Sequence, residues 1–190
     1  MARPKSQDKR NAILVAAIEL IAGQGLSVPT AKIAHAAGVA EGTLFTYFET
    51  KERLLNELYL ELKREEREEM TRDYPVHASL KARARYVWDN YVGLGIAQPH
   101  KFKAMTQLSV SDHIWEQTKR QSVEGFEAIS AMLQECLTSG ALKDQPHEFG
   151  VALFISMRNM TIEFMLHHPS EADRFRDAGF TAFWNAVTTT

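Results

Sequence analysis

The stretch from Thr30 to Phe48, TAKIAHAAGVAEGTLFTYF, constrains the fold of this chain more than any other segment. Thr30 is a favourable N-cap for a short helix whose inner face includes Ile33. Gly38 supplies the positive φ that ends this helix and allows a tight turn, and Leu44 continues the apolar face on a second helix. Two short helices joined in this way are the layout that places the second helix in the major groove of DNA. A helical corner without any role in DNA binding remains the alternative.

The rest of the chain also predicts helices, because no window shows sustained strand-like alternation and glycines and prolines are few. We expect an all-α protein of about nine helices, with a three-helix N-terminal head that contains the helix-turn-helix and a larger helical body. Besides the pair above, the expected helices run over residues 6–25, 51–73, 79–98, 100–108, 112–137, 146–167 and 170–187. Thr50 is the expected N-cap of the helix from Lys51, and the charged run 63–69 within it is expected to be mostly solvated. The expected division is residues 1–50 for DNA binding and 51–190 for ligand binding and dimerisation.

Composition excludes several classes of protein. Cys136 is the single cysteine, so no internal disulfide can form, which fits a cytoplasmic protein. The seven histidines lack metal-ligand spacing, and no phosphate-cradling glycine loop is present. No segment reaches the ~20 apolar residues of a membrane span, and the N-terminus is polar. We therefore expect no enzymatic activity, no cofactor, no metal and no membrane; a small helical enzyme or adaptor is the remote alternative.

Charge is distributed unevenly, although the net charge is only −2. Residues 1–51 carry six Lys or Arg against four acids, and the remaining residues carry sixteen against twenty. Four of these six bases, Arg3, Lys5, Lys9 and Arg10, lie in the first ten residues. A basic head on an acidic body suits a small DNA-reading unit.

At this point the sequence resembles the TetR family of bacterial repressors. The matching residues are Ile13-Leu14, Ala16-Ala17, Gly25, Thr30, Ile33-Ala34, Ala37-Gly38-Val39, Gly42-Thr43-Leu44-Phe45, Tyr47-Phe48 and Lys51-Glu52-Arg53-Leu54-Leu55. The resemblance implies a homodimer that binds a near-palindromic operator on double-stranded DNA and represses transcription. It also implies that Thr30, Thr43, Tyr47 and Lys51 hold phosphates, with Lys32 as a further DNA contact, and that Glu41, Gly42 and Thr46 face the bases.

Two positions depart from the family pattern. Phe45 stands where the family usually has a tyrosine, so one phosphate-contacting hydroxyl is missing from the expected DNA contacts. Glu41 either accepts a hydrogen bond from cytosine N4 or stabilises the N-terminus of its helix, and we favour the second role.

A finer resemblance within the family is carried by residues 1–6, 40–45 and 58–60, Trp88, Phe149-Gly150 and Leu153-Phe154. These segments are most similar to the RamR-type repressors of multidrug-efflux regulation. This resemblance implies an aromatic pocket for a small-molecule inducer, with Tyr59, Trp88 and Phe154 at the matching positions and Arg158 and Asn159 nearby. Aromatic faces bind flat or cationic molecules without strict hydrogen-bond geometry. Asn159 and Val151 replace acids of the relative and Arg158 adds a cation that Glu163 could pair with, so neutral or anionic ligands are favoured. A sensor of one metabolite, such as a fatty acid or an acyl thioester, is the alternative, and each aromatic could be ordinary core.

The last two expected helices are candidates for a dimer interface, since the first of them is apolar nearly all round. Gly179 in the middle of the final helix costs about 1 kcal/mol relative to alanine unless a neighbour must come close. A core helix within a single chain is the alternative. The candidate interface residues are Leu153, Met160, Phe164, Phe175, Gly179, Phe183 and Val187.

Overall fold

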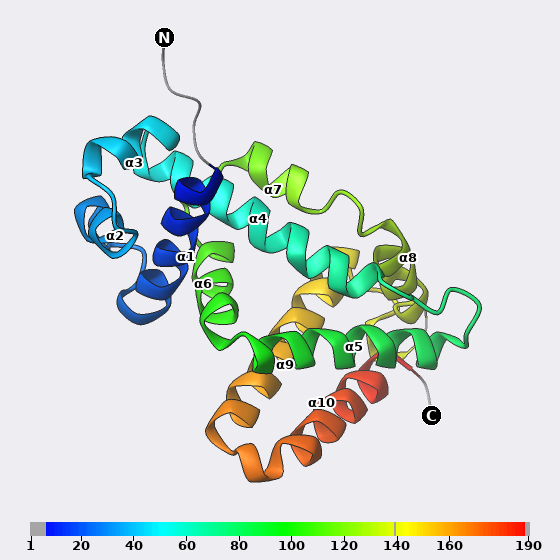
Figure 1. Cartoon of the computed structure of the whole chain (residues 1–190). Coiled ribbons are helices and arrows are strands. Elements are labelled where there is room, and N and C mark those ends of the chain that lie inside the picture. The colour runs from blue at the N-terminus through cyan, green and yellow to red at the C-terminus, as the bar shows by residue number, and fades with distance from the viewer. Residues whose placement is uncertain (1–6, 139, 189–190) are drawn as a thin grey trace. The chain divides into compact units, whose positions relative to one another are not determined.

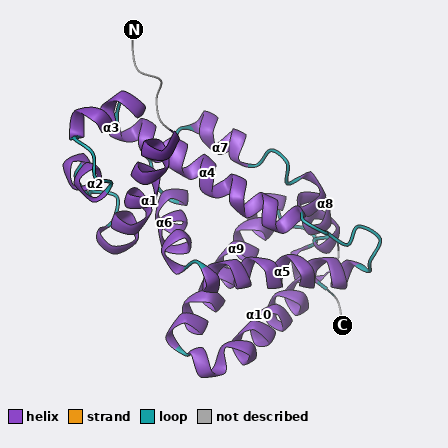
Figure 2. Ribbon diagram, viewed as in Figure 1, coloured by secondary structure: helices purple, strands orange, loops and turns teal. Residues whose placement is uncertain are grey.

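Helices make up the regular structure of the protein. The computed structural model describes residues 7–138 and 140–188, and this part of the chain contains helices and loops but no strand (Figure 2). The helices are α1 (Gln7–Gln24), α2 (Thr30–Ala36), α3 (Glu41–Tyr47), α4 (Lys51–Thr71), α5 (Leu80–Ala97), α6 (Pro99–Ser109), α7 (Glu116–Ser122), α8 (Glu127–Cys136), α9 (His147–His167) and α10 (Ala172–Val187). Figure 1 shows these helices from α1 to α10 in chain order. Two 3-10 turns, η1 (Gly140–Leu142) and η2 (Pro169–Glu171), precede α9 and α10. The all-α prediction is confirmed. Arg3, Lys5 and the predicted start at Ser6 lie outside the described residues.

The chain forms two compact units, which do not divide at a single point in the sequence. The first unit comprises residues 1–65 and 98–123, and the second comprises residues 66–97 and 124–190. Helix α4 therefore contributes its first two thirds to one unit and its end to the other. The functional division at residues 50 and 51 stays a prediction, since these units follow packing and not function.

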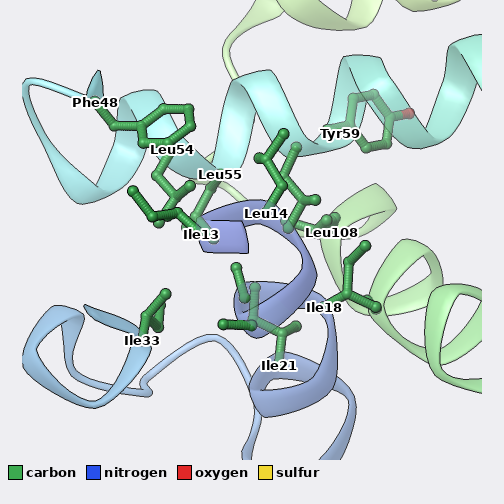
Figure 3. Close-up of a cluster of buried hydrophobic side chains, with 14 of the residues drawn as sticks. Ile13, Leu14, Ile18, Ile21, Ile33, Phe48, Leu54, Leu55, Tyr59 and Leu108 are labelled. Atoms are coloured by element: carbon green, nitrogen blue, oxygen red, sulfur yellow. The ribbon is translucent and has the colours of Figure 1, made fainter. Parts of the chain in front are cut away.

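The first unit is built around α1, which packs against α2 and α6. Ile13, Ala17 and Ile21 recur every four residues on α1 and are fully buried. Leu54 and Leu55 on α4 and Leu108 on α6 join this core (Figure 3). Leu58 on α4 belongs to it as well. This packing holds the N-terminal helices as one body.

In the second unit, α9 and α10 pack against each other and both pack against α5, while α8 contacts α5 and α9. The core here includes a cluster of buried aromatic side chains, with Trp88 from α5, Phe154 from α9, and Phe180 and Phe183 from α10.

The predicted single helix over residues 112–137 is wrong, because the segment holds two shorter helices. The described residues form ten α-helices, because this segment contains α7 and α8. Gly125 between them adopts φ +82°, and the Arg67 side chain donates a hydrogen bond to the Glu124 carbonyl (Nη1–O 3.0 Å). Upstream, the buried side-chain amide of Asn56 accepts from the Trp115 N–H and donates to the His113 carbonyl. These side chains give hydrogen-bond partners to backbone groups of the loops, which would otherwise find their partners within a helix.

The charged run 63–69 is also less solvated than predicted, because Glu66 is buried. Leu58, Leu62, Glu66 and Met70 follow one another at intervals of four on α4, and all four are buried. The acid therefore lies on the same face of the helix as the apolar residues. The predicted N-cap at Thr50 is confirmed, since its Oγ1 accepts from the Arg53 N–H at 3.0 Å.

Among the described residues, α9 alone is long and apolar enough to meet the length and composition of a membrane span. Core helices of soluble proteins meet the same criterion. Phe154, Arg158, Ile162 and Met165 of α9 are buried inside the second unit, so this signal is weak.

Candidate functional site

The corner between α2 and α3 has the geometry that its sequence predicts. Gly38 adopts φ +68°, and the Val39 N–H bonds to the Ala34 carbonyl at 3.0 Å across the turn. Ile33 on α2 and Leu44 on α3 are fully buried in the core of the first unit. The two helices are thus fixed at their inner faces, which leaves the other side of α3 accessible.

The outer face of α3 carries short polar groups and one large apolar side chain. Glu41, Gly42, Phe45 and Thr46 are exposed, and Thr43 and Tyr47 are half-buried. The Thr46 hydroxyl donates to the Gly42 carbonyl at 3.0 Å, so its oxygen still has lone-pair capacity to accept a further bond.

Thr30 does not cap α2 as predicted. Pro29 is the N-cap, and the Thr30 hydroxyl donates instead to Glu41 Oε1 at 2.6 Å. Pro29 holds the extended backbone that an N-cap needs, which moves Thr30 one position into the helix. Glu41 lies in the first turn of α3, where the helix dipole favours an acid. The pair joins the starts of the two helices, a link that sequence spacing does not reveal.

The cations predicted to meet DNA have different surroundings. Lys51 is half-buried in the first turn of α4, and burial lowers the pKa of its ammonium from the ordinary value. Lys32 is exposed on α2, and its Nζ lies 3.2 Å from Gln24 Oε1. The starts of α2 and α4 and the outer face of α3 therefore all belong to the first unit, where they offer cations and hydroxyls.

The three aromatics predicted for the ligand pocket do not belong to one unit. Tyr59 is buried in the core of the first unit (Figure 3). Trp88 and Phe154 lie together in the second unit, with ring centroids 5.9 Å apart, and Phe183 lies 5.0 Å from Phe154. The Trp88 Nε1–H donates to the Arg176 carbonyl at 3.1 Å. Two of the predicted aromatics thus form a close-packed cluster in the second unit.

Arg158 adds a buried cation beside this cluster. Its Nη1 donates to Glu66 Oε1 at 3.1 Å, and its guanidinium carbon lies 3.8 Å from the centroid of the Tyr91 ring. The neighbouring Coulombic charge of Glu66 helps hold the pKa of Arg158 above its usual value against desolvation by burial. Glu66, not Glu163, is the acid next to Arg158. The sequence did hold a sign that Glu66 is buried, because Glu66 lies on the apolar stripe of α4. Asn159 is half-buried on α9.

The predicted interface residues divide into buried and exposed groups. Phe183 and Val187 are buried inside the second unit. A Cβ placed on Gly179 would lie 2.7 Å from Trp88 Cζ2 and closer still to Thr161 Oγ1, so the close neighbours of this glycine come from its own chain.

In contrast, Met160 is 55% exposed and Phe164 is 49% exposed on α9. Leu153 is half-buried, and the ring of the half-buried Phe175 lies 5.5 Å from that of Phe164. These four side chains form the accessible part of the predicted set.

Within residues 7–138 and 140–188, no three His, Cys, Asp or Glu side chains lie together in a way that could hold a metal ion. Cys136 is buried, and desolvation raises the pKa of its thiol to about 11.

Comparison with known proteins agrees with the helical corner. Residues 13–58 match the family described as bacterial regulatory proteins, tetR family. The fatty acid metabolism regulator protein of Bacillus subtilis is 32% identical over 136 residues, which cover 70% of each chain. A crystal structure of a tetR family transcription regulator from Shewanella sp. PV-4 is 30% identical, covers 94% of this chain and 97% of that chain, and gives a TM-score of 0.82.

The crystal structure of FadR from Bacillus subtilis in complex with stearoyl-CoA shares the fold, with a TM-score of 0.69, 20% identity and coverage of 93% of this chain and 98% of that chain. Together, the 32% identity over 70% of each chain, the matched N-terminal segment and the geometry of α2 and α3 show the family. The chain belongs to the tetR family of bacterial regulatory proteins.

Proposed function

We propose that this transcription regulator is a cytoplasmic repressor that binds a near-palindromic operator as a homodimer and is released by an amphipathic ligand of the fatty-acyl class. The observation that carries the DNA-binding part is the fixed corner of α2 and α3, which leaves Glu41, Gly42 and Thr46 exposed for base contacts. Thr30, Thr43, Tyr47 and Lys51, with Lys32, are the proposed phosphate contacts.

Dimerisation through α9 and α10 is supported by the exposed side chains of Met160 and Phe164. Apolar side chains that gather on one surface are usually covered by a partner. A two-fold interface uses the same patch on both subunits, and it matches an operator made of two inverted half-sites. The proposed interface therefore comprises Leu153, Met160, Phe164 and Phe175, without the buried Phe183 and Val187.

The fatty-acyl class is supported by the chemistry of the second unit and by the 32% identity to a regulator of fatty acid metabolism. The cluster of Trp88, Phe154, Phe180 and Phe183 is apolar, and the buried cation Arg158 beside it favours a ligand with negative charge.

The second candidate is a flat aromatic inducer, as in regulation of multidrug efflux, with no carboxylate or phosphate. Its support is the aromatic cluster, whose rings could stack on such a molecule. A cationic compound is disfavoured by Arg158, which is why this candidate ranks second.

DNA binding is tested by selecting bound sequences from a random duplex library, followed by footprinting at moderate salt. We expect an inverted repeat whose half-site centres lie ~34–36 Å apart, about one helical turn. Bound sequences without two-fold symmetry would contradict the proposed dimeric repressor.

The ligand class is tested by measuring release of that operator on addition of oleoyl-CoA, oleate or ethidium. The acyl compounds should release the operator, and Phe154→Leu should weaken their effect, while Phe149→Leu at the exposed start of α9 should not. Release by ethidium alone would favour the aromatic inducer over the acyl one.

A further inference from the structure

Arg158 and Glu66 form a buried ion pair that packing alone does not require. The side chains are 9% and 8% exposed, so both charges have left water. The desolvation of a buried pair generally offsets its Coulombic attraction, and well-packed apolar residues of similar volume are often as stable or more so. A pair retained in such a place is a candidate for a role in specificity or switching.

The hydrogen bonding of Arg158 is incomplete. Its Nη1 donates to Glu66 Oε1, but its Nε is buried and has no hydrogen-bond partner. A buried donor without an acceptor costs free energy that an incoming acceptor recovers. This guanidinium can thus donate a hydrogen bond to an additional negatively charged oxygen.

Arg158 also stands at the end of a continuous series of aromatic rings. Its guanidinium lies over Tyr91, whose ring centroid is 6.1 Å from that of Phe154. Phe154 in turn contacts Trp88 and Phe183, at 5.9 and 5.0 Å between centroids. One cation at the end of this apolar cluster of buried rings matches the two parts of an amphipathic molecule with an anionic head.

We propose that Arg158 recognises the anionic head group of the effector, and that Glu66 is the internal carboxylate that engages Arg158 until the effector replaces it. This inference rests on the proposed ligand-responsive function and names the residues that read the ligand. The shared chemistry is a negatively charged oxygen, from a fatty-acid carboxylate or from the phosphates of an acyl thioester of coenzyme A.

Replacement of Glu66 has a consequence for the DNA-binding end of the chain. A buried carboxylate that loses its cation must reach water or bind a proton. Glu66 belongs to α4, which runs without interruption from Lys51 to Thr71. Any displacement of Glu66 therefore acts on the helix that begins directly after the corner of α2 and α3.

The binding test uses the purified full-length chain and isothermal titration with oleate, oleoyl-CoA and the uncharged oleyl alcohol. Arg158→Met should weaken binding of the anionic probe by about 10- to 100-fold, the range of a charge-assisted hydrogen bond. Oleyl alcohol affinity should change by less than about threefold, since it has no charge for Arg158 to read. The control is Arg174→Met, at an exposed arginine of α10. An equal loss for the alcohol and the anionic probes would show a structural role and overturn the proposal.

The same titrations distinguish a carboxylate from the phosphates of coenzyme A, because they show which probe loses affinity in Arg158→Met. A loss for oleate but not for oleoyl-CoA assigns the carboxylate, and a loss for oleoyl-CoA alone assigns its phosphates. A loss for both shows that Arg158 binds the charged oxygen of either molecule. If the unmodified protein binds oleyl alcohol as tightly as both anions, the proposal is wrong.

Glu66→Gln tests the competition directly. Because it removes the internal competitor, this variant should bind the anionic probe several-fold more tightly, and Glu68→Gln on the same helix should not. Unchanged or weaker binding would overturn the role of Glu66. If Arg158→Met fails to fold, as a lone buried carboxylate predicts, the double variant Glu66→Gln, Arg158→Met removes both charges and carries the same comparison.

Measurements of operator binding distinguish failure of the proposed repressor function from failure of the proposed role of Arg158. If the unmodified chain binds no symmetric operator, the proposed function fails. If it binds an operator that oleyl alcohol releases as well as the anions do, the repressor stands and only the role of Arg158 fails.

Discussion

Thr46 and Tyr47 are adjacent on α3, yet their side chains have different surroundings. Thr46 is exposed, whereas Tyr47 is half-buried and packs against the core of the first unit. A side chain anchored at its base is suited to hold a phosphate at a fixed place, and an exposed hydroxyl is suited to meet the edge of a base.

Substitutions at these positions should separate the overall affinity for operator DNA from the preference for particular bases. Tyr47→Phe removes one neutral hydrogen bond and should weaken binding to all operators by about 0.5–1.5 kcal/mol. Lys51→Ala should weaken binding equally across sequences and lower the salt dependence by about one phosphate contact. Thr46→Val should change base preference at one position of each half-site. Competition with single-base operator variants measures this, and uniform losses from all three substitutions would contradict the assignment of Thr46.

The pKa of the Cys136 thiol is set mainly by its burial. Its Sγ lies 3.7 Å from Met132 Sδ, and desolvation raises the pKa of the thiol from 9.0 to about 11. The raised pKa means that the unfolded chain loses this proton at lower pH than the folded protein does.

The free energy of unfolding should therefore fall as pH rises between about 9 and 11, with a contribution of up to about 1.4 kcal/mol per pH unit from this thiol. Below pH 9 the thiol is protonated in both states, and its contribution no longer varies with pH. Urea unfolding at several pH values measures the slope, and Cys136→Ala should reduce it. An identical slope in that variant would show that the thiol does not titrate in this window.

At the scale of elements, glycine sites show where helices approach most closely. Gly179 on α10 faces Trp88 and Thr161 at contact distance, whereas a Cβ on Gly93 of α5 would meet nothing within 4 Å. Both glycines lie inside helices, so they share the same intrinsic cost relative to alanine.

Gly179→Ala should destabilise the protein by about 1–3 kcal/mol through overpacking. Gly93→Ala, the matched control, should stabilise it by up to about 1 kcal/mol. Thermal unfolding of both variants, each compared at the same protein concentration, measures the difference. A stable Gly179→Ala variant with altered association would instead place this glycine at the dimer interface.

At the scale of the whole molecule, the proposed repressor needs two copies of the chain to read an inverted repeat. The exposed side chains of Met160 and Phe164 are the surface available for this purpose on α9. Their exposure contrasts with the buried Phe183 and Val187, which belong to the core of one chain.

Phe164→Asp should convert a dimer into a monomer of 21.5 kDa and reduce operator affinity, because a buried unpaired charge opposes association. Sedimentation velocity measures the change in mass. Val110→Asp, at a residue that is 82% exposed in the first unit, is the control and should leave the mass unchanged. A dimer that persists in Phe164→Asp would place the interface elsewhere.

Much of this protein could be predicted from sequence, because the deciding forces were local or periodic. The positive φ of Gly38, the cap at Thr50 and the buried stripe of α1 all follow from residue type and spacing. The helix-turn-helix was predictable for the same reason, since its glycine and its apolar positions are close together in the chain.

Other features depended on residues far apart in sequence. Asn56 satisfies the backbone of residues 113 and 115, which converts a predicted helix into a loop before α7. Glu66 is buried because Arg158, on α9, brings a compensating charge. Local sequence determined that helices form and where the corner of α2 and α3 lies, but only the tertiary structure decided where polar groups find their partners, because an acid in a charged run is solvated or buried according to what packs against it.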